Sequence, residues 1–151
     1  MTGIVIELDK KSLETVLGAI DNLSTASSDL TPVWDDVGAY FGSEVEQRFQ
    51  DEQAWDGIPW QQSERAKNEG GKTLVDHAHL RDSFTWNADT DGFEFGTNVI
   101  YAAIHQKGGE AGRNKSVTLP ARPILPSALN NADDTEILNI VNRHLENAMR
   151  N

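Results

Sequence analysis

Apolar side chains recur at helical spacing in long segments of the chain. In residues 31–49 they follow one another at intervals of three or four, which makes one face of a helix apolar. Thr31 is expected to cap this helix, with Pro32 at its first position. A C-terminal helix is expected to begin with Asp133 or Asp134 as its cap. The apolar positions of the two helices are Val33, Trp34, Val37, Phe41, Val45 and Phe49, and then Ile137, Ile140, Val141, Leu145 and Ala148.

The first thirty residues predict a strand and then another helix. Ile4, Ile6 and Leu8 alternate with other residues, which is typical of a short half-buried strand. Ser12 can cap a helix whose apolar residues again recur at helical spacing. Residues 24–29 form a polar break after it. The apolar positions of this helix are Leu13, Val16, Leu17, Ile20 and Leu23.

The middle of the chain predicts a β-hairpin. Apolar residues alternate along 84–88 and again along 93–95, and Asp91 and Gly92 between them are typical turn residues. Residues 99–106 predict one or two helical turns, ended by glycines. The alternating residues of the hairpin are Phe84, Trp86 and Ala88 on one strand and Phe93 and Phe95 on the other.

Two glycines interrupt the long helix predicted over residues 31–49. Gly38 and Gly42 lie about one turn apart, and each costs about 1 kcal/mol relative to alanine in a helix interior. Either a close backbone contact offsets this cost, or the helix tolerates the glycines without a packing reason.

The predicted elements together define an α+β fold. A small antiparallel sheet with a central hairpin is expected to pack against two N-terminal helices and a C-terminal helix. Residues 61–79 are polar and predict a mobile loop or short helix, and 107–116 predict a mobile Gly-rich loop before a strand in 116–120. A chain of 151 residues is expected to form a single domain over residues 1–151.

Composition narrows the class of protein. The hydrophobic fraction of 38% and mean hydropathy of -0.51 indicate a globular chain with a thin core, part of which a partner is expected to complete. There is no cysteine, so neither a disulfide nor a thiolate metal site can form. No apolar run approaches the roughly 20 residues of a membrane span, so no membrane partner is expected.

The net charge of -11 argues against general binding to nucleic acid, which requires a basic surface. Such a charge suits either a solvated surface or a wall that repels passing DNA. Against this background Arg113, Lys115 and Arg122 form a local basic group. This basic group either contacts DNA or the acidic surface of a neighbouring subunit, or it belongs to a solvated loop without a partner.

Candidate catalytic chemistry is sparse. Asp76, His77 and His79 offer metal ligands, but a zinc site would need His105 or another carboxylate as well. Nothing resembles a nucleophile elbow or a phosphate-binding loop. Ordinary polar histidines are the alternative interpretation, and no cofactor is expected.

The prolines Pro120, Pro123 and Pro126 predict a stiff extended segment, because each fixes its own φ and biases the preceding residue toward extended conformations. Such a segment suits the anchoring of a loop better than movement during catalysis.

Four stretches together resemble the phage virion morphogenesis, or tail completion, family, which includes the Mu-like G proteins and P2-like S proteins. They are the spaced Phe and Glu followed by AWDGIPW at 49–60, the spaced Leu, Asp, Leu and Ser at 74–83, FGTNVIYAAIHQKGG at 95–109, and LPARPIL at 119–125. The resemblance covers roughly residues 10–145. It departs at His77 and Ala78, where Thr-Gly is expected, so the local loop there is expected to differ.

The resemblance implies a non-enzymatic structural protein that acts at tail completion or head-tail joining. It implies self-association into a ring, with a hexamer favoured, contacts to other tail or neck proteins, and DNA passage without specific binding. The chain is then expected in the virion, after assembly in the host cytoplasm. A metal-dependent hydrolase and a DNA-binding adaptor remain the alternatives. The interface candidates are Trp60, His105, Arg113, Lys115, Arg122 and Ile124.

Overall fold

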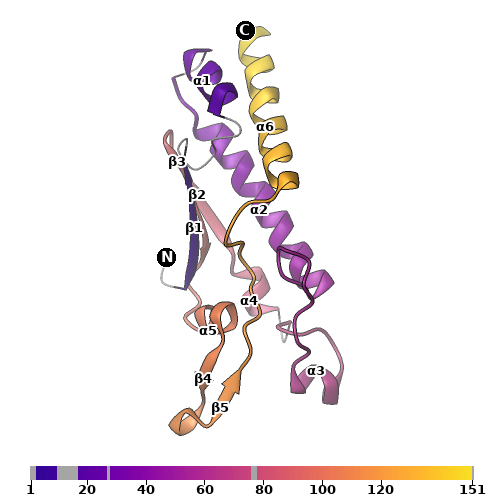
Figure 1. Ribbon diagram of the computed structural model, residues 1–151. Helices are drawn as coiled ribbons and strands as arrows, with labels where there is room; N and C mark the ends of the chain where they lie inside the picture. Colours follow the sequence, from indigo (N-terminus) through magenta and orange to yellow (C-terminus); the bar gives the residue numbers. More distant parts are fainter. Residues whose placement is uncertain (1–2, 10–16, 27, 76–77, 151) are drawn as a thin grey trace. The chain divides into compact units, whose positions relative to one another are not determined.

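The computed structural model describes residues 3–9, 17–26, 28–75 and 78–150. The chain divides into two compact units. Unit 1 contains Met1–Val5, Gly42–Thr85 and Gly96–Ser127, and unit 2 contains Ile6–Phe41, Trp86–Phe95 and Ala128–Asn151. The elements, labelled in Figure 1, are β1 (Ile4–Asp9), α1 (Leu17–Ala26), α2 (Thr31–Asp51), α3 (Glu64–Glu69), α4 (His79–Asp82), β2 (Thr85–Ala88), β3 (Gly92–Thr97), α5 (Ala102–Lys107), β4 (Gly109–Ala111), η3 (Arg113–Lys115), β5 (Val117–Leu119) and α6 (Asn131–Arg150).

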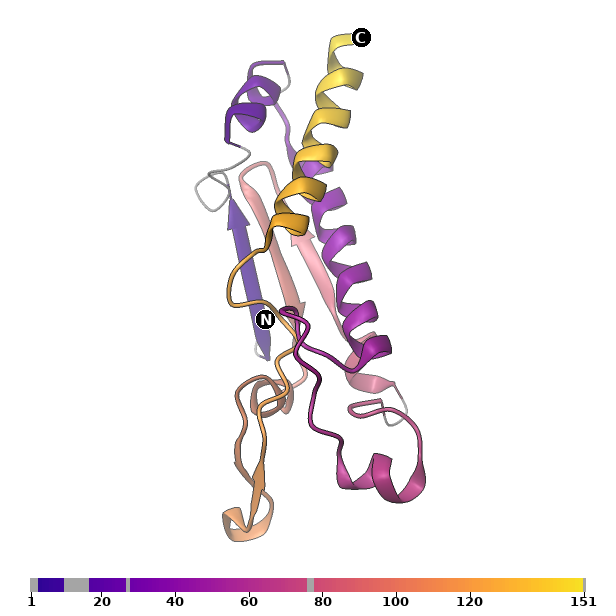
Figure 2. The same cartoon turned by 45° about the vertical axis from the view of Figure 1, so that its right-hand side comes forward.

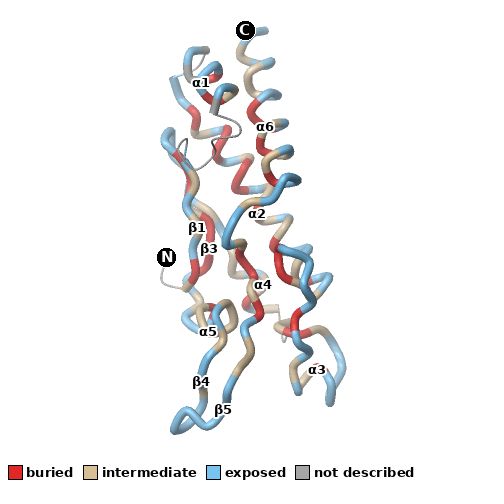
Figure 3. Tube along the Cα trace, in the orientation of Figure 1, coloured by how far each residue is buried: buried red, intermediate tan, exposed pale blue. Residues whose placement is uncertain are grey.

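The α+β prediction is confirmed. A three-stranded sheet has the order β1-β3-β2, and β4 and β5 form a separate two-stranded antiparallel sheet. The predicted apolar stripe of α2 is buried along its whole length, as the red segments of that helix in Figure 3 show. Among the described helices, none combines the length and the apolar character that crossing a bilayer requires.

In unit 2, the first half of α2 packs its aromatic residues on the central strand β3. Trp34 stacks on Phe93 with ring centroids 6.1 Å apart, and Phe41 lies 5.6 Å from Phe93 and 6.0 Å from Phe95. On β2, Trp86 stacks on Phe95 at 6.3 Å. Because these rings interdigitate, the helix and the hairpin strands share one aromatic core.

The helix α6 is tied to α2 by polar contacts within unit 2. Tyr40 donates a hydrogen bond of 2.7 Å to Asp133, and the His144 ring lies 2.6 Å from Asp36 Oδ2. The start of α6 is a reciprocal cap, because the backbone N–H of Asn130 donates to Asp133 and that of Asp133 donates to the Asn130 side chain. The cap is therefore Asn130, three residues before the predicted Asp133. The helix α6 also packs against α1 (Figure 2).

Two other predicted termini differ from the structure. Thr31 is the first residue of α2, and its hydroxyl donates a hydrogen bond of 2.6 Å to the Asp29 carboxylate. Asp29, which precedes the helix, therefore interacts with its first residue. The hairpin turn lies before Gly92, which is already the first residue of β3. A side chain at Gly92 would collide with the carbonyl of Leu8 on β1, so close strand approach, and not turn geometry, requires a glycine there.

Part of the predicted N-terminal helix lies outside the described residues. This part includes the cap Ser12 and the apolar residues Leu13 and Val16. Within α1, Ile20 and Leu23 are buried as predicted. The single-domain organisation and the mobility of residues 61–79 and 107–116 stay predictions, although 61–79 contains the short helix α3, one of its two expected forms.

The question raised by Gly38 is answered by a close contact. A Cβ atom at Gly38 would overlap the indole ring of Trp86. That ring is held in place because its Nε1 donates a 2.8 Å hydrogen bond to Asp35, one turn before Gly38 on α2. The glycine therefore allows Trp86 to lie directly on the helix backbone.

We expect Gly38→Ala to destabilise the protein. Overpacking of a core contact costs about 1–3 kcal/mol, more than the roughly 1 kcal/mol that alanine gains in helix propensity. Gly18→Ala in α1 is the matched control, because a Cβ atom added at Gly18 would meet nothing within 4 Å, and it should be neutral or stabilising. Urea denaturation would measure the free energy of unfolding of both variants. A Gly38→Ala protein as stable as the Gly18→Ala protein would contradict the packing argument.

Candidate functional site

The conspicuous polar network of unit 1 joins α5 to the proline-rich segment 120–126, here called the strap. The side chain of Gln106 accepts hydrogen bonds from the backbone N–H groups of Ile124, at 2.7 Å, and Leu125, at 3.0 Å. Its amide nitrogen donates a hydrogen bond of 2.9 Å to the Leu125 carbonyl. One glutamine thus pairs with the strap as a neighbouring strand would.

The backbone of the strap makes a fourth contact with α5. The backbone N–H of Arg122 donates a hydrogen bond of 2.7 Å to the carbonyl of His105. Prolines have no N–H, and they prevent the strap from forming a regular element, so its remaining N–H groups need acceptors from elsewhere. The end of α5 supplies acceptors for the N–H groups of Arg122, Ile124 and Leu125.

Three of the predicted interface residues are buried within unit 1. Trp60, Arg122 and Ile124 are 7%, 5% and 0% exposed. The Trp60 indole donates a hydrogen bond of 2.8 Å to the carbonyl of Pro123, and Arg122 Nε donates one of 2.7 Å to the carbonyl of Gln61. These side chains fasten the strap to the segment that follows α2. Their roles at an interface stay predictions.

His105 is half-buried at the end of α5. Its ring meets the edge of Tyr101 at 6.1 Å, and its Nδ1 is buried without a hydrogen-bond partner among the described residues. Burial lowers the pKa of His105, and the nearby Arg122 guanidinium lowers it further, so the ring is neutral at neutral pH. The backbone carbonyl of His105 accepts the hydrogen bond from the Arg122 N–H described above.

The metal-site hypothesis gains nothing from the geometry. The ring of His79 lies 6.3 Å from that of Tyr101, while Asp76 and His77 lie outside the described residues. In the part of the chain that the structure describes, no three His, Asp or Glu side chains gather closely enough to hold a metal ion.

The other two candidates, Arg113 and Lys115, lie at the tip of a hairpin. Strand β4 pairs antiparallel with β5, from Gly109 opposite Leu119 to Ala111 opposite Val117, and η3 forms the turn. The prediction of a loop throughout 107–115 is therefore wrong, whereas the strand predicted in 116–120 is confirmed. We call residues 109–119 the arm (Figure 1).

The tip of the arm is exposed, including both cations, as the pale blue tube in Figure 3 shows. Its base is closed by Gly108, whose φ of 73° ends α5 and turns the chain into β4. Any side chain at Gly108 would come within 2.7 Å of the Ala121 backbone nitrogen, so the two ends of the arm approach closely.

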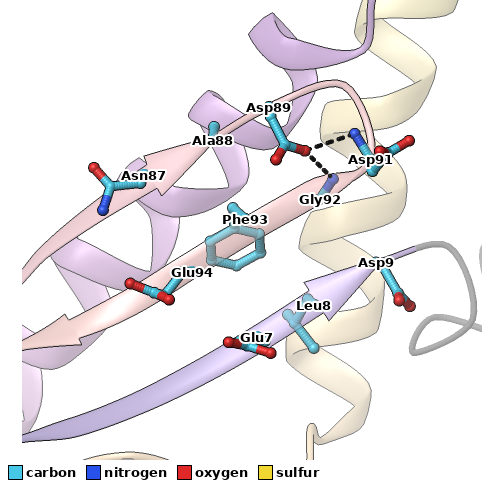
Figure 4. A pocket seen from close by; sticks show the side chains of 10 residues that line it. All are labelled: Glu7, Leu8, Asp9, Asn87, Ala88, Asp89, Asp91, Gly92, Phe93 and Glu94. Carbon is cyan, nitrogen blue, oxygen red and sulfur yellow. Dashed lines mark hydrogen bonds between the residues drawn. The ribbon is translucent and has the colours of Figure 1, made fainter. Parts of the chain in front are cut away.

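Unit 2 carries an acidic depression of about 550 Å³ between β1 and the β2–β3 hairpin (Figure 4). Asp89 accepts hydrogen bonds from the N–H groups of Asp91, at 2.8 Å, and Gly92, at 3.1 Å, and so shapes the turn at its rim. Among the described residues, no basic side chain contributes to its lining. The carboxylates that line it are Glu7, Asp9, Asp89, Asp91 and Glu94.

The sequence interpretation did not identify Gln106 as the residue that holds the strap. A signal was present, because a proline-rich segment with few N–H groups and no regular structure requires acceptors from a neighbouring element. Arg65, which lines a cavity next to His105 and Arg122, was also missed, and its sequence context gives no signal of this position.

Comparison with known proteins identifies relatives over almost the whole chain. The model of the phage virion morphogenesis family matches residues 9–146. The protein named Mu-like prophage FluMu G protein 2, from Haemophilus influenzae (strain ATCC 51907 / DSM 11121 / KW20 / Rd), is 32% identical over 136 residues, which cover 89% of this chain and 91% of the relative. No solved structure matches the chain.

We expect Gln106→Ala to destabilise unit 1 by about 2–4 kcal/mol, because two N–H donors on nearly fully buried residues lose their acceptor. Gln62→Ala, at an exposed position, should change stability by less than about 0.5 kcal/mol. Chemical denaturation would measure stability, and amide hydrogen exchange at Ile124 and Leu125 would localise the change. Unchanged exchange at both amides would contradict the role assigned to Gln106.

Proposed function

Because the chain belongs to the phage virion morphogenesis family, we propose that it is a structural, non-enzymatic protein that completes the tail or joins it to the head. The family membership covers residues 9–146, so the proposal concerns nearly the whole chain. The virion is then the place where the protein acts.

The use of the polar side chains in unit 1 supports a structural role. Gln106, Trp60 and Arg122 all direct hydrogen bonds at backbone groups of the chain itself. A catalytic group must instead be available to a substrate within hydrogen-bonding distance. These residues position the arm and the strap.

The observation that carries the assembly proposal is the arm. Residues 109–119 contain the two basic residues Arg113 and Lys115 and one acidic residue, Glu110, in a chain with a net charge of -11. Arg113 and Lys115 are exposed at the tip. In our proposal the arm of one copy binds the acidic surface of the next, and this charge complementarity sets register and partner choice.

The acidic depression of unit 2 is the acceptor in this proposal. Its five carboxylates complement the arm tip, and they belong to unit 2, whereas the arm belongs to unit 1. A contact between two different surfaces is heterologous, and it generates a ring when the rotation between copies closes. We propose a ring, with six copies favoured, whose acidic character lets DNA pass without binding.

Neither alternative function is supported. The metal-dependent hydrolase lacks a gathered ligand set among the described residues, and the family that matches the chain is one of virion morphogenesis. The exposed cations Arg113 and Lys115 would serve a DNA-binding adaptor, but the net charge of -11 opposes binding to DNA. An acidic protein surface has a lower charge density than the phosphate backbone, so the net charge of the chain repels it less.

Charge reversal tests the proposed contact. Light scattering behind size exclusion should give the wild type a mass that reaches a plateau, near 100 kDa for six chains of 16.7 kDa. Arg113→Glu with Lys115→Glu should reduce the mass to that of one chain, and so should Glu7→Lys with Asp91→Lys, because each pair places like charges across the contact. A mixture of the two variants should assemble again, with the copies alternating.

Lys67→Glu with Arg150→Glu is the matched control, because both side chains are exposed and lie outside the arm and the depression. This control should keep the wild-type mass. Failure of the mixed variants to associate would reject the assigned pair of surfaces, and a wild-type mass of 16.7 kDa at every concentration would reject self-assembly.

A further inference from the structure

Unit 1 contains a cavity of about 360 Å³ whose chemistry the proposed function does not use. The strap, α5 and the segment from α3 to α4 contribute to its lining. Its polar side chains include Arg65, His105 and Arg122. Its apolar walls are Leu74, Leu80 and Leu119.

The two guanidinium groups of this cavity are paired with neutral atoms. Arg122, only 5% exposed, donates from Nε to the carbonyl of Gln61, and Arg65 donates 2.8 Å to the carbonyl of Lys72. No carboxylate is among the described residues that line the cavity. Other arginines of unit 1 are different, because Arg48 pairs with Glu44 and Arg81 with Asp82, each at 2.7 Å.

This difference matters energetically. A buried cation is costly unless an opposite charge and hydrogen bonds replace the water that it has lost. Backbone carbonyls supply hydrogen bonds but no formal charge. The depressed pKa of Arg122, which burial causes, reflects that cost.

His105 adds an independent observation. Its ring lines the cavity, and its Nδ1 is buried without a hydrogen-bond partner among the described residues. Buried polar atoms of this kind are rare in native proteins and call for a specific explanation.

We propose that the cavity binds one carboxylate group carried on an aliphatic stem. Arg122 and Arg65 bind the carboxylate oxygens, the neutral His105 ring lies beside them, and the three leucines contact the stem. A carboxylate fits better than a phosphate, because a single deeply buried cation suits a single negative charge and the leucine walls would not solvate a dianion. This site is independent of the ring proposal.

Histidine NMR tests the site with sodium butyrate as the probe and butyramide, its neutral counterpart, as the control. At neutral pH and constant ionic strength, butyrate should shift the His105 Cε1–H signal in a saturable manner, with a millimolar dissociation constant suited to so small a ligand. Butyramide should leave the signal unchanged. His105→Gln assigns the resonance.

Substitutions then assign the charges. Arg122→Gln should abolish the saturable shift, and Arg65→Gln, at a less buried position that keeps the fold accessible to measurement, should weaken butyrate binding at least about tenfold. Lys67→Gln removes a charge from the same helix α3 but outside the cavity, and it should change the affinity less than about twofold. No saturable shift, an equal shift with butyramide, or an affinity unaffected by both arginine substitutions would overturn the proposal.

The carboxylate can come from a solute or from a side chain of another copy. A dilution series without butyrate distinguishes the two. If the His105 signal moves with protein concentration and butyrate competes with that change, another copy supplies the carboxylate. If the signal is independent of protein concentration while butyrate binds, the site takes a free carboxylate. Both results support the site, and Arg113→Glu with Lys115→Glu should leave butyrate binding unchanged.

Discussion

The hydrogen bonds between the Gln106 side chain and the strap are the interaction on which the functional part of unit 1 depends. The arm follows α5 after Lys107 and Gly108 and returns into the strap, so the three bonds from Gln106 to Ile124 and Leu125 hold its two ends together. The Arg122 N–H to His105 carbonyl bond reinforces this closure. An arm anchored in this way presents its tip with little loss of conformational entropy on binding.

Anchoring the strap also creates the chemistry beside it. The strap carries Arg122 into a buried position, where the Gln61 carbonyl is its neutral partner, and it places that charge next to His105. The same segment therefore stabilises the arm and contributes Arg122 to the lining of the cavity for which we propose a carboxylate ligand.

The arrangement of charge connects the fold to the assembly proposal. Carboxylates gather in a depression of unit 2, whereas the basic residues of the arm lie at its exposed tip in unit 1. In the proposed assembly these two surfaces meet between copies, and the net charge of -11 disfavours nucleic acid as a competing partner of the arm. Electrostatic complementarity of this kind steers association and suppresses wrong partners.

Periodicity predicted the long elements well, because burial of one helix face repeats every three to four residues. Every apolar position named for α2 is buried, and Ile137, Ile140 and Val141 are buried on α6. Strand β4 of the arm was missed because a three-residue strand that begins with glycine has no usable alternation. The placement of Trp60 and Arg122 inside unit 1 depends on tertiary contacts with distant carbonyls, which spacing along the chain does not encode. The predicted cap of α6 was wrong for a related reason, because Asn130 and Asp133 bond reciprocally and either side chain alone resembles a cap. The family resemblance was more reliable than any single residue, because it used four separate stretches, and the match over residues 9–146 confirms it.

The central claim is that this chain is a structural component of virion assembly at the tail or the head-tail junction. The most direct test is electron microscopy of particles from the phage or prophage that encodes it, with and without the gene. The account predicts that loss of the gene leaves heads and incomplete or unjoined tails, and that the wild-type chain supplied in trans restores complete particles. Complete, infectious particles formed without the chain would contradict the account.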